Sequence, residues 1–501
     1  MKKFILIISL FVLAIGLDSC KTGDLELTNP NGIPAGNFPN TSAELVAGLN
    51  AVYAPLQSFG LYGRYLPFLL DNMVENTGRA ALSGDLRAFT EMTFKPENGD
   101  ILLYWKNCYA GISRANLLLD NLDKIEQIKD ATPETKATYV GEVKFLRAHY
   151  YFLLVSRFGD IPLYTTNAPA INDGTGFKRS PKEDVYQLII ADLQDAASKL
   201  REKSAEDNGR ATIGAANSLL GKVHLYRKEY AEAKAAFDKV IASGEYSLTA
   251  NYFDNFTIEA EHNSESIFEI EFDLEAQGGN AWAANWGGGD DGQQELSARS
   301  REYGFLGWHN VNPTDALVDA FEANDPRLHE TVFLVGDLYG ASNTAITQDQ
   351  IGDEKSAWRK YEIAYKSDGE GGLSEINHRA IRYADVLLMA AEAENELGNM
   401  AEAISLMNQT RTRVGIDNYG TAAMNATYPV TTKDEVFAAL VHERQVELAG
   451  EQTRFPDLVR WGMAGDNIPN FVVGKHEIFP IPQGEIDTNI NLSNEDQNPN
   501  Y

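Results

Sequence analysis

The sequence has few cysteines and a shortage of positive charge. Two cysteines in 501 residues are too few for a framework of disulfide bonds. Lys and Arg number 43 against 72 Asp and Glu, which gives a formal net charge of -29. This balance argues against binding to nucleic acid or to an anionic membrane surface, because both favour clustered Lys and Arg. The eight histidines are scattered, and none forms a ligand pair at helical spacing.

The long apolar run of the sequence lies at its start, from Phe4 to Leu17 after two lysines. It is too short for the roughly 20 residues of a spanning helix and is typical of an export signal. The segment 17–20 resembles a lipobox ending on Cys20, although Asp18 is unusual there. We therefore predict a signal peptide over 1–19, acylation of Cys20 and a lipidated tether over 20–41. The alternative is an ordinary cleaved signal followed by a free cysteine.

The body of the chain has a helical pattern. Ser42 is a candidate cap for a first helix, and long helical stretches follow over 101–128 and 134–158. Gly159 suits the left-handed position after the second stretch. Ser180, followed by Pro181 and Glu183, predicts a capped helix to about residue 200.

Two segments, 216–241 and 384–410, have the same pattern of small and large residues. Gly221 precedes Ala233 by the same interval that separates Ala391 from Ala403. The spacing matches tetratricopeptide repeats, in which small residues let two antiparallel helices approach closely. Gly221 is thus expected where the two helices of its pair cross.

Residues 250–380 have a different character. Residues 266–272 alternate like a strand, 276–312 are rich in Gly, Asn, Trp and Asp, and 336–378 are polar and irregular. We therefore predict an all-α fold: one domain over 42–501, with a tetratricopeptide-like helix-pair scaffold (42–249 and 381–501) and a loop-rich insertion with short strands (250–380) on the ligand side.

Several motifs together carry a resemblance to a known family. They are Phe145–Phe152 leading to Phe158–Leu163, Gly209–Thr212, Asn312–Phe321 with Asp325–Arg327, Arg382–Leu388, the late helix from Glu443 to Trp461, and Pro480–Gln483 with Gln497–Pro499. With these motifs in this order, the chain resembles the SusD/RagB family of outer-membrane nutrient-binding lipoproteins. Departures from the family pattern are Asp385, Gly450, Gln452, Pro456 and Asn500.

The resemblance implies a helical body with four helix-pair repeats, lipid-anchored at the cell surface in the outer membrane. It implies a partner, a TonB-dependent transporter of the SusC type, and a role in capturing glycans or peptides. It also implies a protein that is not an enzyme and needs no cofactor.

Charged residues of these motifs lie among apolar neighbours, so we expect them to form ion pairs that fix the helix packing. They are Arg147, Arg157, Arg382, Glu443, Glu447, Arg454, Asp457 and Arg460.

Aromatic residues in glycine-rich and polar stretches are the candidate ligand contacts, because tryptophan and tyrosine rings stack on the C–H face of a sugar while amides and carboxylates bind its hydroxyls. The candidates are Trp282, Trp286, Trp308, Tyr303, Asn285 and Asp290, together with Asp71, Asn72 and Arg79 from an earlier polar loop. The alternative is that some of these tryptophans fix the insertion onto the scaffold. The predicted function is capture of a neutral or weakly charged glycan.

Other chemistries have weaker support. A peptide or another nutrient is the main alternative cargo. Asp290 and Asp291 near Glu295 could bind Ca²⁺, but they lack the oxygen spacing of a dedicated site, so no metal is predicted. Glu269, Glu271 and Asp273 share one face of a predicted strand, which could serve a glycoside hydrolase or form an outward-facing acidic row.

Overall fold

The computed structural model describes residues 38–78, 86–166, 176–276, 295–352, 354–369 and 371–501. The predicted signal peptide, Cys20 and most of the tether lie outside these residues. No helix of the described residues is both long and apolar enough to cross a membrane.

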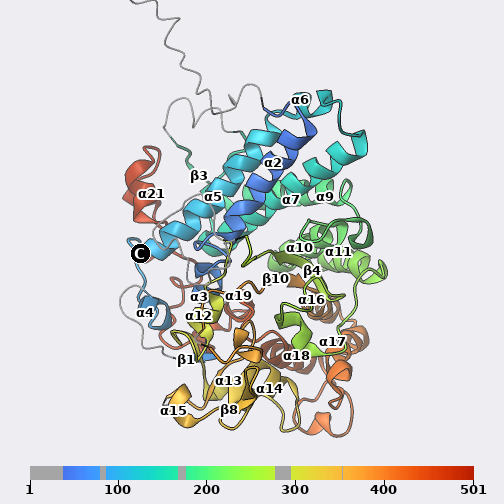
Figure 1. The fold of residues 1–501 in the computed structure, drawn as a ribbon, viewed down its shortest axis with the longest axis vertical. Coiled ribbons are helices and arrows are strands. Elements are labelled where there is room, and N and C mark those ends of the chain that lie inside the picture. Colours follow the sequence, from blue (N-terminus) through green and yellow to red (C-terminus); the bar gives the residue numbers. More distant parts are fainter. Residues whose placement is uncertain (1–37, 79–85, 167–175, 277–294, 353, 370) are drawn as a thin grey trace, which may run out of the picture.

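Four long helices build one end of the molecule (Figure 1). They are α2 (Ser42–Tyr53), α5 (Gly99–Leu119), α7 (Pro133–Phe158) and α9 (Lys182–Ala197), and they pack in sequence order on one another. Helix α7 contributes most to the core because its inward residues, from Phe145 to Phe158, are largely aromatic or aliphatic. It ends at Gly159, whose φ of 71° favours glycine, as predicted.

Three details differ from the sequence predictions. The cap of α2 is Thr41, whose hydroxyl accepts a hydrogen bond from the Glu44 amide at 3.2 Å, and Ser42 is the first helical residue. The stretch 101–128 breaks at Asp120 into α5 and the short α6 (Leu122–Gln127). Ser180 lies in a short strand, so Pro181 and not Ser180 precedes α9.

The two predicted helix pairs are present. Helices α10 (Ile213–Tyr226) and α11 (Tyr230–Ala242) pack against each other, as do α16 (Tyr383–Glu396) and α17 (Met400–Val414). Helix α11 also contacts α16, and α18 (Lys433–Glu447) closes the stack (Figure 1). A Cβ added at Gly221 would lie 2.4 Å from Cε1 of Phe237, so the glycine is where the helices approach closely.

Between the two pairs the chain forms short helices and strands. Strand β4 (Ser266–Ile270) pairs antiparallel with β10 (His378–Arg382), and this pairing brings together segments more than 100 residues apart. The other strand pairs are β1 (Thr77–Gly78) with β5 (Asn312–Pro313), β2 (Ile161–Pro162) with β3 (Arg179–Ser180), β6 (Val332–Leu334) with β9 (Ser356–Trp358), and β7 (Leu338–Tyr339) with β8 (Thr344–Ala345). The fold is thus helical with short strands, as predicted.

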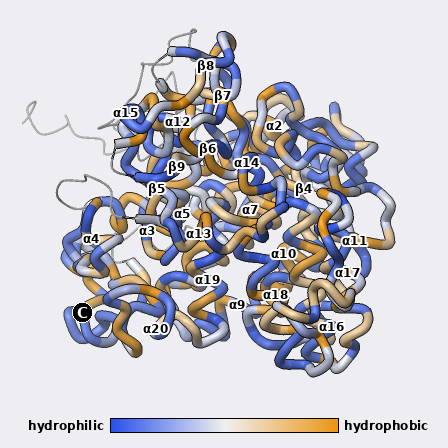
Figure 2. Tube along the Cα trace, turned by 90° about the horizontal axis from the view of Figure 1, so that it is seen from below, coloured by the Kyte–Doolittle hydropathy of each residue, from blue (hydrophilic) through white to orange (hydrophobic). Residues whose placement is uncertain are grey.

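The remaining helices are short. They are α3 (Tyr65–Asn72), α4 (Arg87–Thr90), α12 (Arg299–Tyr303), α13 (Asp315–Ala320), α14 (Arg327–Thr331), α15 (Gln348–Ile351), α19 (Arg454–Arg460), α20 (Ala464–Asn467) and α21 (Gln483–Thr488). Seen from below, α15, β7 and β8 gather at one side of the molecule, and α10, α11, α16 and α17 at the other (Figure 2). A continuous cluster of buried apolar residues joins the helices of both ends.

The predicted ion pairs fix the junction of α18 with the scaffold. Glu447 is fully buried and accepts hydrogen bonds from three guanidinium groups, those of Arg327 at 2.9 Å, Arg382 at 2.7 Å and Arg413 at 2.6 Å. These charges hold the pKa of Glu447 well below its usual range, although burial alone would raise it.

The other predicted pairs follow the same pattern. Arg147 binds Asp192, Arg454 binds Glu75, Arg460 binds Asp457 and Glu392, and Glu443 binds Arg327 and Arg411. Arg157 differs, because its guanidinium donates to the carbonyl oxygen of Ser156 at 3.3 Å.

Candidate ligand-binding surface

Among the predicted aromatic contacts that the structure describes, Trp308 is the exposed one. Its side chain is 49% exposed, whereas Trp358, the other tryptophan among the described residues of 250–380, is 1% exposed. The guanidinium carbons of Arg301 and Arg64 lie 5.2 and 5.8 Å from the centre of its ring. Cation–π contacts of this kind hold the indole in place. The ring is therefore fixed while about half of its surface remains open to a ligand.

The residues beneath Trp308 are ordered by Glu302, which is buried. Its carboxylate accepts hydrogen bonds from Nε of Arg64 at 2.6 Å and from the side-chain amide of Asn310 at 2.7 Å. The backbone turn needs glycine, because a Cβ at Gly307 would lie 2.5 Å from the carbonyl oxygen of Arg301. The amide of Trp308 donates to that same oxygen at 2.6 Å. Arg64, Trp308 and Asn310 form what we call the Trp308 surface.

A cleft of about 1200 Å³ is lined in part by the segment that follows Trp308. Thr314 and Ala316 line it, opposite residues 72–78, 90–95 and 468–476. Strand β1 brings residues 77 and 78 against β5, and the amide of Thr314 donates to the carbonyl oxygen of Asn76 at 3.0 Å. We call this space the Asn72 cleft.

Polar atoms in the wall of the Asn72 cleft have no hydrogen-bond partner among the described residues. They include Oδ1 of Asn72, Oγ1 of Thr77 and Nε2 of His476, all on side chains at least nine-tenths buried. Nδ1 of His476 accepts a hydrogen bond from the amide of Val472 at 2.9 Å, and burial lowers the pKa of His476 to about 4. Its Nε2 therefore carries a proton and is a donor. Buried polar groups without a partner in the protein are usually satisfied by bound water or by a polar ligand.

Two of the predicted contacts are buried and bind each other. The hydroxyl of Tyr303 donates to Oδ2 of Asp71 at 2.7 Å, and the backbone amide of Gln452 donates to Oδ1 of Asp71 at 3.1 Å. Tyr303 is 1% exposed and Asp71 is 4% exposed. This pair ties α12 to α3 beneath the surface, so it positions the site without an open face of its own. Asn72, the next residue, lines the cleft.

The remaining predicted contacts, Trp282, Trp286, Asn285, Asp290 and Arg79, lie outside the described residues. The structure adds residues that the sequence did not indicate, namely Arg64, Arg301 and Asn310 around Trp308, and Thr77 and His476 in the cleft. Arg301 and Asn310 stand within seven residues of Trp308 and were open to prediction. His476 lies far along the chain, and tertiary packing alone brings it to Asn72.

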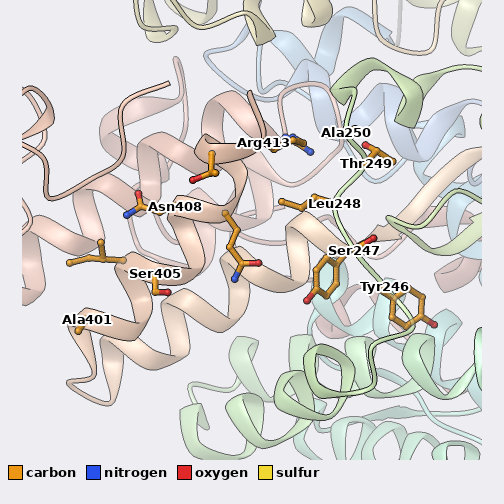
Figure 3. Close-up of a pocket in the computed structure, with 13 residues that line it drawn as sticks. Tyr246, Ser247, Leu248, Thr249, Ala250, Ala401, Ser405, Asn408 and Arg413 are labelled. Atoms are coloured by element: carbon orange, nitrogen blue, oxygen red, sulfur yellow. The ribbon is translucent and has the colours of Figure 1, made fainter. Parts of the chain in front are cut away.

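Another open groove, of about 910 Å³, lies between residues 246–250 and one face of α17 (Figure 3). Ser405 and Asn408 line it from the helix, and Ser247 and Thr249 from the facing segment. Its aromatic residues, Tyr246 and Tyr383, are 5% and 7% exposed. Because neither ring offers an open face for stacking, this groove suits a sugar less well than the Trp308 surface does.

The predicted outward-facing acidic row is wrong for Glu269, which is 3% exposed. Nε of Arg379 lies 3.2 Å from its carboxylate, and the side-chain nitrogen of Asn377 donates both to Glu269 at 3.0 Å and to Glu271 at 3.1 Å. Oδ1 of Asn377 accepts from the amide of Phe272, which fixes this orientation. His262 also lies 3.3 Å from Glu271, so the three could group around a metal ion. Asn377 thus donates to both carboxylates and Arg379 pairs with Glu269, so these side chains hold residues 377–379 against β4, and nothing beyond this grouping supports a catalytic or metal-binding role.

Comparison with known proteins agrees with the class that the fold defines, a helical protein with short strands. A model of the SusD family matches residues 264–471, and a second model, described as "Starch-binding associating with outer membrane", matches residues 45–225. The chain belongs to the SusD/RagB family.

Among its relatives, SusD-like protein P2 of Formosa agariphila is 28% identical over the whole of both chains. A SusD superfamily protein from Bacteroides vulgatus shares the fold with a TM-score of 0.78 and 27% identity, covering 92% of this chain and 99% of that one. A structure described as a laminarin-binding SusD-like protein gives a TM-score of 0.75 and 27% identity, covering 92% and 100%.

Proposed function

We propose that this protein captures oligosaccharide or polysaccharide on the Trp308 surface and in the Asn72 cleft. The observation that carries the proposal is a half-exposed tryptophan held by two arginines, and the polar Asn72 cleft supports it. An indole face stacks on the C–H face of a sugar, and the amides and hydroxyls of the cleft bind sugar hydroxyl groups. The laminarin-binding relative and the starch-binding family description support a glycan.

The cellular role follows from the sequence and the family. We propose that Cys20 carries acyl chains, that the protein is exposed on the outer membrane, and that it delivers the glycan to a SusC-like TonB-dependent transporter. The family description links such proteins to the outer membrane. As a binding protein of this kind, the chain would need neither a catalytic residue nor a cofactor.

Replacing Trp308 by alanine tests the proposal. Loss of a stacking contact is expected to cost on the order of 1–3 kcal/mol of binding free energy, by analogy with base stacking, and so to weaken glycan binding about five- to a hundred-fold. The melting temperature is expected to change little, because the side chain is half exposed. Calorimetry with laminarin and starch oligosaccharides, beside thermal melts, measures both.

The matched control is Leu338→Ala, which removes another exposed apolar side chain, 56% exposed on β7. This variant is expected to bind as the wild type does. A Trp308→Ala variant that binds normally but melts early would show that the tryptophan is structural. Binding of peptides in place of glycans would favour the alternative cargo.

A further inference from the structure

A further pocket, of about 370 Å³, lies among helix ends of the scaffold, and we call it the basic pocket. It is bounded by the C-terminal ends of α7 and α10, the N-terminal end of α9, helix α19 and residues 477–478. It shares no lining residue with the Asn72 cleft. Its volume lies at the lower end of the range for small-ligand pockets.

The charge of this pocket opposes that of the molecule. The chain as a whole has a formal net charge of -29, with far more acidic than basic residues. Five side chains in the wall of the pocket are nevertheless cationic, Arg157, Lys182, Arg227, Lys228 and Arg460, and two are acidic, Glu183 and Glu477. A concave site of one sign concentrates ions of the opposite sign.

Two of the five cations are already neutralised. Arg227 pairs with Glu183 and with Glu229, and Arg460 pairs with Glu392 and Asp457. For Arg157, Lys182 and Lys228, no carboxylate oxygen of the described residues lies within 4.0 Å of a charged nitrogen, the limit for an ion pair. These three are the cations that the pocket can offer to a ligand.

Helix ends account for only part of this charge. Arg157 lies in the last turn of α7, and Lys228 follows the end of α10, where the helix dipole favours cations. Lys182 instead begins α9, at a helix N-terminus that favours anions. A cation at that position makes the field of the pocket more positive and adds nothing to the stability of its own helix.

Two tyrosines add neutral donors. The hydroxyls of Tyr186 and Tyr226 have no hydrogen-bond partner within the part of the chain that the structure describes. Their rings are held in place, Tyr186 by the guanidinium of Arg227 at 5.4 Å and Tyr226 by the ring of Phe152 at 5.1 Å. The pocket therefore contains fixed aromatic rings and many more donors than acceptors, a combination that suits an oxyanion.

We propose that the basic pocket binds the sulfate or carboxylate group of an acidic saccharide. The guanidinium of Arg157 can bind two oxygens of such a group side by side, and the ammonium groups of Lys182 and Lys228 neutralise its charge. The inference that the oxyanion belongs to a saccharide rests on the proposed function. The affinity of the basic pocket for an oxyanion does not. The protein would then hold an acidic sugar here independently of stacking on Trp308.

Calorimetry on the purified protein at constant ionic strength and pH 7 tests the proposal, with sodium sulfate, sodium glucuronate, inorganic phosphate and neutral glucose as probes. The wild type is expected to bind sulfate and glucuronate but not glucose. Arg157→Gln with Lys228→Gln is expected to weaken both by about tenfold or more, the effect of losing hydrogen bonds between charged groups. Lys129→Gln, an exposed lysine outside the pocket, is expected to leave binding unchanged, as is Trp308→Ala.

Equal affinity of the double variant and the wild type for sulfate, or no binding of sulfate, glucuronate or phosphate by the wild type, would overturn the proposal. Binding of phosphate without glucuronate or sulfate would overturn the saccharide source. A thermal melt of the double variant shows whether it is folded. If the double variant melts early, the same calorimetry is carried out on the single variant Lys182→Gln, which changes an exposed residue at the start of α9. Loss of glycan binding in Trp308→Ala with sulfate binding intact would separate this site from the proposed function.

Discussion

At the scale of single residues, the charges that hold this fold together are concentrated around α18. Glu443 and Glu447 lie one helical turn apart, fully buried, and both bind Arg327. Arg382 extends the network to Glu265 and Glu451. Such a network stabilises a fold only when every member is paired, because the cost of removing a charge from water is large.

Glu447→Ala is therefore expected to destabilise the protein strongly. The substitution leaves Arg327, Arg382 and Arg413 without a shared carboxylate in the interior, and breaking a buried pair typically costs about 3–5 kcal/mol. Urea denaturation followed by circular dichroism measures the loss. Glu402→Ala, which removes an exposed glutamate on α17, is the control and is expected to change the free energy of unfolding by less than about 0.5 kcal/mol. Similar losses for both variants would contradict the network's role.

At the scale of elements, helix pairs depend on small residues where they cross. Gly221→Leu places a side chain against the ring of Phe237, where even a Cβ would be 2.4 Å from the nearest ring carbon. The expected cost is about 1–3 kcal/mol, because an already packed contact must open. Gly99→Leu at the start of α5 is the control, since nothing lies within 4 Å of a Cβ there. A melting temperature of Gly221→Leu equal to that of the control would contradict the close crossing.

The helix pairs could be predicted because they repeat a spacing within one short segment each. Gly221 and Ala391 indicate the crossings, and the observed helices begin and end within a few residues of the predicted ones. Helix starts were harder, because Thr41 and Ser42 are both good caps and only the backbone geometry separates them.

The candidate site could be predicted only in part, because tertiary packing and not local sequence determines which of its residues are exposed and which meet. Trp308 stands out by its glycine-rich surroundings, but the sequence gives no sign that Tyr303, five residues earlier, is buried against Asp71. The Asn72 cleft brings together Asn72 and His476, which are just over 400 residues apart, and no local sequence pattern predicts such a contact.

At the scale of the whole molecule, buried histidines and buried acidic groups have opposite effects on how stability depends on pH. Burial lowers the pKa of His149 to about 3 and of His309 and His476 to about 4, and it lowers that of His378 well below its usual range. Burial raises the pKa of two glutamates, Glu142 and Glu261, to about 7, and it also raises that of Glu362, Asp71 and Glu202. The histidines lose stability as the pH falls below 6.5, while the glutamates lose it as the pH rises from about 4.5 to about 7.

We expect His149 to make the free energy of unfolding decline as the pH drops from about 7 to about 5, against the opposite contribution of the acidic groups. His149 alone accounts for about 1.4 kcal/mol per pH unit below 6.5, since it stays neutral in the folded state down to about pH 3. Urea denaturation at pH 7, 6 and 5 measures the decline. The free energy of unfolding of His149→Gln is expected to fall less with decreasing pH than that of the wild type, and an equal pH dependence of the two proteins would contradict a buried neutral His149.

The attachment of the whole molecule to a membrane is expected to depend on one atom, the sulfur of Cys20. Cys20→Ala should produce a folded protein that no longer partitions with membranes, because the acyl chains on that cysteine are its predicted hydrophobic anchor. Labelling of cells with radioactive palmitate, followed by separation of membrane and soluble fractions, measures this. The chain supplies its own control in Cys108, which is fully buried in α5, so Cys108→Ala is expected to keep the label. Equal label in the wild type and in Cys20→Ala would contradict the lipoprotein prediction, since Cys108 is shielded from acylation by the surrounding core.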